Sequence, residues 1–299
     1  HVRSRRQRQM CIRDRFNTLQ MGMVAADRIF KILETESKMT DEGQWSPEHI
    51  EGKISIKNLE FSYLPDEKVI HGINLEILPG EKIAIVGATG AGKSTLINLL
   101  SRFYEFQTGE ICLDDRSIKE YVLNSLRKHV GIVLQDVFLF ADTIYNNITL
   151  YNPKVNRTMV EEAAKQIGVH EFIESLPGGY DYNVKERGVM LSSGQRQLIA
   201  FLRVYISNPS VLVLDEATSS IDSHSEELIE NATRKITSNK TSILIAHRLS
   251  TIKNADRIVV MDSGKIVEIG SHKELLKIKD GFYAQLYKIQ FLEEAVLLK

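Results

Sequence analysis

The sequence predicts an α/β fold with a mainly parallel sheet, an antiparallel β subdomain and an inserted helical subdomain. Three short, continuous apolar runs, KIAIVG, SVLVLD and SILIAH, are typical of strands buried on both faces of a parallel sheet. The runs KISIKNLEFSYL, VIHGINLEIL and EICLDD are β-branched or alternating and are separated by turns, which predicts a small antiparallel sheet. A helix-rich stretch, roughly residues 137–205, separates the first apolar run from the second.

The first element along the chain is a basic segment. Residues 1–15, HVRSRRQRQMCIRDR, contain six arginines and one acid, and such an arm could bind anionic lipid or nucleic acid. The interpretation that we favour is a non-native origin. QMCIRDR back-translates readily to CAG ATG TGT ATA AGA GAC AG, which resembles a transposase adapter used in sequencing libraries. On this hypothesis the native sequence starts near Phe16.

Residues 16–50 are predicted to form a helix followed by a linker. Apolar side chains recur at spacings of three and four from Phe16 to about Glu34, at Phe16, Leu19, Met23, Ala26, Phe30 and Leu33. The polar stretch ETESKMTDEGQWSPEHIEG, which contains Gly and Pro, then indicates a linker. The main domain is expected over residues 51–290, and residues 291–299 form a C-terminal tail.

Composition excludes several classes of protein. The formal net charge of −1 argues against nucleic acid as the main partner. Cys11 and Cys112 make no disulfide framework, which favours a reducing compartment. No stretch approaches the roughly 18 to 20 apolar residues of a membrane-spanning helix, and no signal peptide is present, so we expect this stretch of chain to be soluble.

The motif GATGAGKST fits the phosphate-binding loop G-x-x-x-x-G-K-[ST], and it lies between a predicted strand and a predicted helix. Its glycines allow the backbone to turn tightly, and the following helix presents its positive end to phosphate. Lys93 would bridge the β and γ phosphates, and Ser94 would hold Mg²⁺. The loop residues predicted to contact the nucleotide are Gly87, Thr89, Gly90, Ala91, Gly92, Lys93, Ser94 and Thr95.

Two further strands end in chemically useful side chains. VLVLDEAT places Asp215 and Glu216 after a buried strand, where the carboxyl ends of parallel strands line the ligand crevice. Asp215 is predicted to hold Mg²⁺ through water, and Glu216 to act as general base on the attacking water. SILIAHRLS brings His247 to the same edge, near the expected γ phosphate, and we predict a catalytic role for it.

Gln135 follows another strand-like run, GIVLQ, and opens the helical insert. It could reach Mg²⁺ and the attacking water while sensing the orientation of the insert. An ordinary polar residue at a strand end is an equally good interpretation of this position.

The stretch LSSGQRQ predicts a second anion-binding helix N-terminus. Ser192 and Gln195 fit an S-x-x-Q capping box, and QRQLIAFLRVYI behind them is helical. This end has no loop or metal of its own. It could be a helix cap and nothing more, or it could cap the γ phosphate held by a second copy of the chain, which implies a dimer with nucleotide sandwiched between the copies.

The ordered set GATGAGKST, Gln135, LSSGQRQ, VLVLDEAT, SSID and His247 resembles the ATP-binding domain of an ABC transporter, over about residues 51–290. The resemblance implies a P-loop NTPase core that uses ATP and Mg²⁺. It implies that Tyr63 stacks on adenine, although Tyr63 could equally be a sheet packing residue. It also implies that Ser192, Gly194 and Gln195 contact the partner's ATP and that Asp222 links the two sites. Gln135 and the turn KERG, Lys185 to Gly188, would face the transport domain.

Two stretches resemble the multidrug or lipid exporter subfamily, in which membrane and ATPase domains share one chain. FNTLQMGMVAADRIFKILE is similar to the end of the last membrane helix, and ERGVMLSSGQRQ to the exporter signature. We therefore expect an ATPase that drives export of a lipid, drug or peptide at the cytoplasmic face of the cell membrane, as a homodimer or heterodimer. The sequence departs from the family pattern at Ser193, where glycine is usual, and in SSID, where SALD is usual.

Other classes fit less well. ABC-type ATPases of DNA repair or chromosome architecture carry long coiled-coil arms before the signature, but fewer than about a hundred residues separate Ser94 from Leu191 here. Translation-associated relatives carry two ATP domains per chain. A non-hydrolysing module would lack Glu216 or His247. The separate ATP subunit of an importer would need no helix like the one predicted at residues 16–34.

Overall fold

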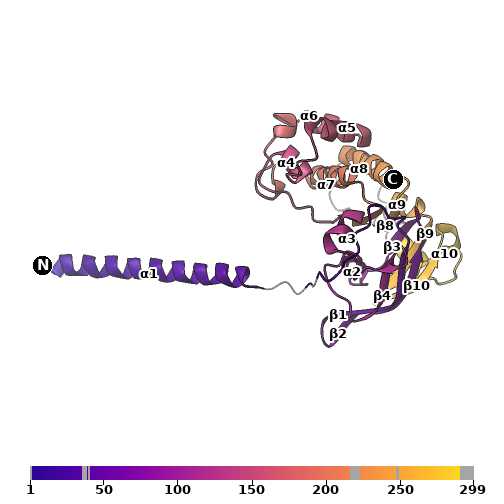
Figure 1. Ribbon diagram of the computed structural model, residues 1–299, viewed down its shortest axis with the longest axis horizontal. Coiled ribbons are helices and arrows are strands. Elements are labelled where there is room, and N and C mark those ends of the chain that lie inside the picture. Colours follow the sequence, from indigo (N-terminus) through magenta and orange to yellow (C-terminus); the bar gives the residue numbers. More distant parts are fainter. Residues whose placement is uncertain (1, 36–38, 40, 216–222, 247–248, 290–299) are drawn as a thin grey trace. The chain divides into compact units, whose positions relative to one another are not determined.

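The computed structural model describes residues 2–35, 39, 41–215, 223–246 and 249–289. The chain divides into two compact units, residues 1–40 and residues 41–299 (Figure 1). Each unit is described by itself.

The first unit consists of helix α1, Val2–Leu33. The apolar periodicity predicts a helix from Phe16, but α1 begins fourteen residues earlier and includes the arginine-rich segment, since arginine is a good helix former. Within the described residues its apolar side chains are uncovered: Phe16, Leu19 and Phe30 are each more than half exposed. In the part of the chain that the structure describes, no helix is both long and apolar enough to cross a membrane.

The second unit begins with the predicted antiparallel sheet. Its strand order is β2-β1-β4-β5, and all of its pairs are antiparallel. The strands are β1 Ile54–Leu64, β2 Glu67–Ile77, β4 Thr108–Leu113 and β5 Arg116–Ser117. Their inward side chains, such as Ile54, Leu59 and Ile70, join a core with helix α2, Lys93–Leu100, and with the strands of the second sheet.

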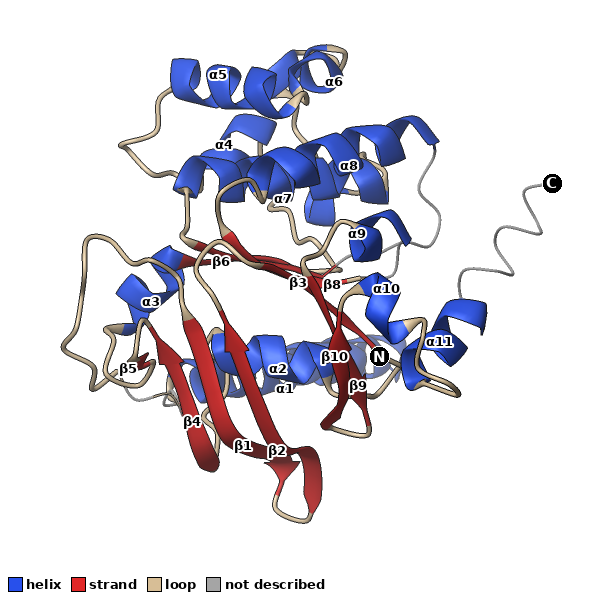
Figure 2. Ribbon diagram, turned by 90° about the vertical axis from the view of Figure 1, so that its right-hand side faces the viewer, coloured by secondary structure: helices blue, strands red, loops and turns tan. Residues whose placement is uncertain are grey.

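The second sheet has the order β10-β9-β3-β8-β7-β6 (Figure 2). Its strands are β3 Lys82–Val86, β6 Val130–Val133, β7 Val211–Asp215, β8 Thr241–Ile245, β9 Arg257–Asp262 and β10 Lys265–Gly270. Only the β9–β10 pair is antiparallel. The parallel sheet is therefore confirmed, and its consequence is that the carboxyl ends of β3, β6 and β7 lie at one edge.

Helices α7 Ser193–Ser207 and α8 Ser223–Ile236 lie on the other face of this sheet. Helices α4 Ile144–Thr149 and α5 Arg157–Ile167 pack against α7, and α6 His170–Glu174 packs against α5. Two short 3-10 turns lie at Gly179–Asp181 and Glu186–Gly188. A second core unites α4, α5, α7 and α8 with strands β6 and β7. The helix-rich stretch predicted at roughly 137–205 contains helices α4 to α7, of which the first begins at Ile144 and the last ends at Ser207, with loops and the two 3-10 turns between them. Helices α9 Leu249–Lys253, α10 His272–Leu275 and α11 Phe282–Tyr287 complete the unit.

Part of the expected linker lies on the domain as an ordered strap, residues 41–52. The amides of Gln44 and Trp45 donate to Glu120 O, and the amide of Val122 donates to Trp45 O. The Arg116 guanidinium lies 4.4 Å from the centre of the Trp45 ring. The strap runs beside α3, Leu123–His129. Its polar composition with Gly and Pro is typical of a linker, and the contacts that order it come from residues some 75 positions later.

Candidate functional site

The phosphate-binding loop connects β3 to α2 and has a backbone that only glycine accommodates. A Cβ atom at Gly87 would lie 2.1 Å from Met261 O, which as a backbone atom cannot move aside cheaply. Gly92 precedes α2 with φ of 95° and offers no side-chain cap. The first amide groups of α2 are therefore not capped by a side chain of their own helix.

Lys93 folds back over this loop. Its Nζ donates to Gly87 O at 2.8 Å and to Ala88 O at 3.0 Å, and the residue is 8% exposed. Burial lowers the pKa of Lys93, and the negative charge of Asp215 partly opposes that shift. A buried cation held by two carbonyl groups can exchange them for phosphate oxygens, which are stronger acceptors.

A pocket of about 410 Å³ lies at this edge of the sheet. It brings together the loop after β3, the residue after β6 and the last residue of β7. Its lining includes the following predicted residues: Thr89, Gly90, Gly92, Lys93, Ser94, Thr95, Gln135 and Asp215. Gly87 and Ala91 belong to the same loop but do not line the pocket. Gln135 is exposed, whereas Asp215 is buried.

Tyr63 lies beside the loop rather than inside the pocket. Its hydroxyl group donates to Thr95 Oγ1 at 3.2 Å. Its ring is edge-on to Phe61 and Tyr104, with centroid distances of 4.8 and 5.0 Å, and the residue is 44% exposed. One face of an anchored aromatic ring therefore remains accessible next to the phosphate-binding loop.

The pocket also contains a donor set that fits Mg²⁺. The Ser94 hydroxyl, the Gln135 amide oxygen and the Asp215 carboxylate are all hard oxygen ligands, and they line one pocket from three different elements. Mg²⁺ usually keeps several waters and takes one or two protein oxygens besides phosphate oxygens. The described residues contain no cluster of three His, Cys, Asp or Glu side chains that would suggest a different metal.

The signature stretch LSSGQ forms a second helix N-terminus. Ser192 is the N-cap of α7, and both hydrogen bonds of the predicted capping box are present. Gln195 N donates to Ser192 Oγ at 3.2 Å, and Ser192 N donates to Gln195 Oε1 at 3.0 Å. Ser192 and Ser193 are exposed, whereas Gly194 is buried. None of these residues lines the phosphate pocket, so the structure does not bring the signature to the nucleotide site of its own chain.

The segment that follows Gln135 is bound to the segments around the signature. Ile144 N donates to Tyr182 O, and Val184 N donates to Asp142 O, both at 3.0 Å, in a short antiparallel bridge. Arg203, on α7, donates to Phe138 O at 3.0 Å. Sequence analysis missed Arg203, because the only signal is one cation within the apolar helical run LIAFLRVYI.

Three predicted site residues, Glu216, Asp222 and His247, lie outside the described residues. The structure places their neighbours: Asp215 ends β7, and Ala246 follows β8 and is buried. Because β7 and β8 are parallel neighbours, Asp215 and Ala246 both lie at the edge of the sheet that holds the phosphate loop.

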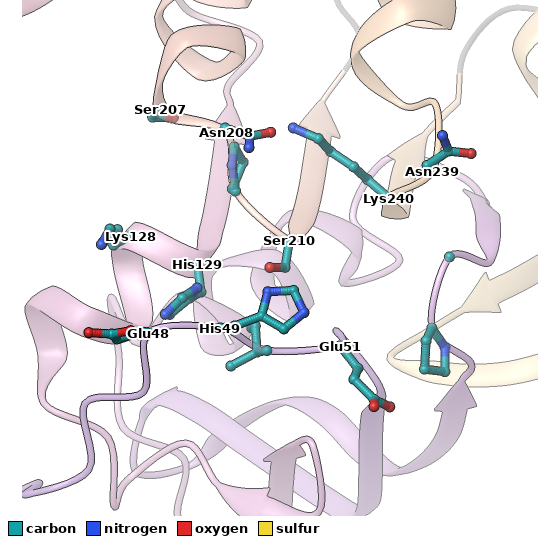
Figure 3. A pocket seen from close by; sticks show the side chains of 14 residues that line it. Glu48, His49, Glu51, Lys128, His129, Ser207, Asn208, Ser210, Asn239 and Lys240 are labelled. Atoms are coloured by element: carbon teal, nitrogen blue, oxygen red, sulfur yellow. The ribbon is translucent and has the colours of Figure 1, made fainter. Parts of the chain in front are cut away.

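A larger pocket, of about 710 Å³, lies elsewhere (Figure 3). Its lining includes His49 and Glu51 from the strap, Asn208, Ser210 and Lys240, but none of the predicted site residues. Helices α3 and α7 end beside it, and helix C-termini carry partial negative charge. The smaller pocket is therefore the better site for a triphosphate.

The comparisons with known proteins agree with this geometry. Residues 70–219 match the ABC transporter family. The chain is 46% identical over 278 residues to the ATP-dependent lipid A-core flippase of Chromohalobacter salexigens, which covers 93% of this chain and 48% of that protein. It is 43% identical over 277 residues to a Bacillus subtilis protein named provisionally for multidrug export, which covers 92% of this chain and 48% of that protein.

A solved structure of a bacterial Atm1-family ABC exporter with ATP bound is also similar, with a TM-score of 0.81 and 39% identity, over 92% of this chain and 48% of that one. The chain thus spans about half the length of these relatives. It belongs to the ABC transporter family, and it carries the ATP-binding, ATPase domain found in the exporters of that family.

Proposed function

We propose that this chain is the motor of an exporter in which two copies of the ATPase domain close around two ATP molecules and hydrolysis reopens them. The observation that supports this most directly is that one chain has two helix N-termini of different kinds. The one at α2 lies in a pocket with charged and metal-binding side chains. The one at α7 is exposed and has neither.

In the phosphate pocket, Lys93 would leave the carbonyl groups of Gly87 and Ala88 and bind the β and γ phosphates. The amide groups of the loop would bind the same oxygens. Tyr63 would stack on the adenine ring with its exposed face. Its contacts with Phe61 and Tyr104 hold the ring in place before ATP arrives, which lowers the entropic cost of binding.

Ser94, Gln135 and Asp215 would hold Mg²⁺ at the phosphates, where the ion would supply positive charge against the charge that develops on the γ phosphoryl group. Glu216 would take the proton of a water molecule as that water attacks the γ phosphorus. The bond from the γ phosphorus to the bridging oxygen breaks, leaving ADP and phosphate. His247 would donate a hydrogen bond to the γ phosphate, and Gln135 would orient the water.

Ser192, Gly194 and Gln195 would complete the site of the opposite copy. The remaining free amide groups of the first turn of α7 would meet the γ phosphate of the partner's ATP, and Asp222 would connect the two sites across the interface. The dimer would be a homodimer if a second copy of this chain supplies the other signature, and a heterodimer if a different chain supplies it.

The transport domain would dock beside Gln135. A groove of about 630 Å³ lies there, and its lining includes the exposed side chains of Phe103, Leu134, Phe138 and Leu150. Exposed apolar surface of this kind is typical of protein interfaces. The relatives are about twice as long as this chain, and their names concern lipid A or multidrug export. A lipid or another amphiphilic molecule is therefore the substrate class that we propose, with the ATPase domain at the cytoplasmic face of the membrane.

Glu216→Gln tests this proposal. Without the base, ATP binds but is hydrolysed about 10² to 10⁴ times more slowly. Light scattering after size-exclusion chromatography in saturating Mg-ATP should show a stable dimer for this variant and a monomer for the same variant in Mg-ADP. A variant that binds ATP normally and stays monomeric would contradict the nucleotide-sandwich dimer.

A further inference from the structure

The segment between Gln135 and α4 is folded around one buried side chain. Asn147 is 1% exposed, and its amide nitrogen donates to Phe140 O and to Thr143 O, each at 3.0 Å. Its amide oxygen accepts a hydrogen bond from Phe140 N at 2.8 Å. This one amide group therefore closes the turn that carries the chain from the phosphate pocket into the helical subdomain.

Arg203 holds the same turn from the signature helix. Its guanidinium donates to the backbone oxygen and to the side-chain oxygen of Asn147, and to Phe138 O. Burial lowers the pKa of Arg203 to about 10. The arginine guanidinium is planar and has five N–H donors in fixed directions, so it can bind three acceptors at once. A lysine ammonium on its flexible side chain cannot hold three acceptors in one fixed geometry.

We propose that Arg203 is a positioning residue that makes Gln135 and the signature stretch move as one body. Arg203 lies eleven residues after Ser192 on the single helix α7, and Phe138 lies three residues after Gln135. A rotation of α7 therefore shifts Gln135 relative to Lys93 and Asp215. This inference rests on the proposed function, because it assumes that Gln135 acts at the nucleotide in this copy and Ser192 at the nucleotide of the partner.

A second contact between the same segments supports the proposal. Leu139 is fully buried, and a Cβ atom at Gly188 would lie 2.8 Å from its Cδ1. The turn KERG just before the signature therefore packs on the residue between Phe138 and Phe140. Arg203 and Asn147, which we call the clamp, hold the residues on either side of Leu139, through Phe138 O and Phe140 O.

The test is Arg203→Met, with Arg157→Met as the matched control. Arg157 is an arginine of the same helical subdomain, and it pairs with Glu161 and Asp181. Within the described residues its hydrogen bonds go to Glu161 and Asp181, and none reaches α7 or the Gln135 segment. For each variant of the 299-residue chain, the melting temperature, the Kd for ATP and kcat are measured well below the melting temperature.

We expect Arg203→Met to lower kcat about 10- to 100-fold, the range for a displacement of up to about 1 Å, while the Kd of the monomer for ATP stays unchanged. Arg157→Met should lower the melting temperature but leave kcat within about twofold of wild type. Equal losses of kcat in the two variants would show that Arg203 acts only through stability, and would overturn the proposal. Failure of the wild-type chain to hydrolyse ATP would instead contradict the proposed function.

Two further variants sharpen the result. Asn147→Ala removes the clamp from the other side, so the double variant with Arg203→Met should lose no more activity than the more affected single variant. Arg203→Lys keeps the positive charge but loses the planar guanidinium, so its kcat should lie between that of Arg203→Met and that of the wild type. Wild-type kcat in Arg203→Lys, or additive losses in the double variant, would count against the clamp.

Discussion

The two helix N-termini of this protein differ in what their first amide groups do. At α2 the residue before the helix is Gly92, which provides no side chain, and Lys93 lies over the loop as a buried cation held by two carbonyl groups. At α7 the reciprocal cap between Ser192 and Gln195 satisfies two donors internally. The first terminus is walled by Asp215 and Gln135, whereas Ser192 and Ser193 at the second face solvent.

In the function that we propose, this difference divides one binding site between the two termini. The α2 terminus is arranged to bind a polyphosphate by itself, because its donors are uncapped and a cation and oxygen ligands lie beside it. The α7 terminus is preorganised by its cap but incomplete, so it can contribute only when a charged group is brought to it. Four substitutions test the division, and their expected effects decrease in the order given.

Lys93→Ala should have the largest effect, since it removes the only cation that lines the phosphate pocket among the described residues. We expect kcat to fall by about 10² to 10³, the range for removing one preorganised group that stabilises transition-state charge. The Kd for ATP should also rise. Lys165→Ala, an exposed lysine on α5, is the control and should behave as wild type. Unchanged hydrolysis in Lys93→Ala would place the active site elsewhere.

Tyr63→Ala should weaken ATP binding next, because stacking of a base on an aromatic ring is worth about 1 to 3 kcal/mol. That corresponds to a rise in Kd of about 5- to 150-fold, measurable by calorimetry. Tyr63→Phe keeps the ring and loses only the hydrogen bond to Thr95, so its Kd should stay close to wild type. If Tyr63→Ala binds ATP normally, Tyr63 is only a packing residue of the sheet.

Ser192→Ala should destabilise the protein by about 1 kcal/mol through loss of the cap of α7. It should leave the Kd of the monomer for ATP unchanged, because Ser192 does not line the phosphate pocket. Ser271→Ala removes a second capping box, at α10, and is the matched control. We expect both variants to melt earlier, but only Ser192→Ala to weaken the ATP-bound dimer in a Glu216→Gln background. If Ser192→Ala and Ser271→Ala dimerise equally well, Ser192 acts only as the cap of α7.

Ser193→Gly should have the smallest effect. The Ser193 side chain is exposed at the first position of α7, and surface substitutions usually change stability by less than about 0.5 kcal/mol. Both the melting temperature and kcat should therefore stay close to wild type, with kcat within about twofold. A large gain in kcat would mean that this side chain obstructs the partner's nucleotide, and would make the α7 terminus the limiting half of the site.

Much of the site was predictable because its determinants are local. The loop from Gly87 to Thr95 needs glycine at positions that the sequence displays, and the cap of α7 joins residues three positions apart. The apolar runs of β3, β7 and β8 predict buried parallel strands, and the edge where Asp215 lies follows from that prediction. These features depend on backbone sterics and hydrogen bonds within a few residues of one another.

The sequence by itself therefore determined the fold class, the family and the phosphate loop of this protein. Only the tertiary structure decided that the N-terminus of α7 does not line the chain's own pocket, that residues 41–52 lie as a strap beside α3, and that Arg203 holds Asn147 across 56 residues of sequence. The physical reason is that a polar side chain has many possible partners in a sequence. Which of them it meets depends on the packing of whole helices and strands, and that packing is set by the combined burial of the apolar cores.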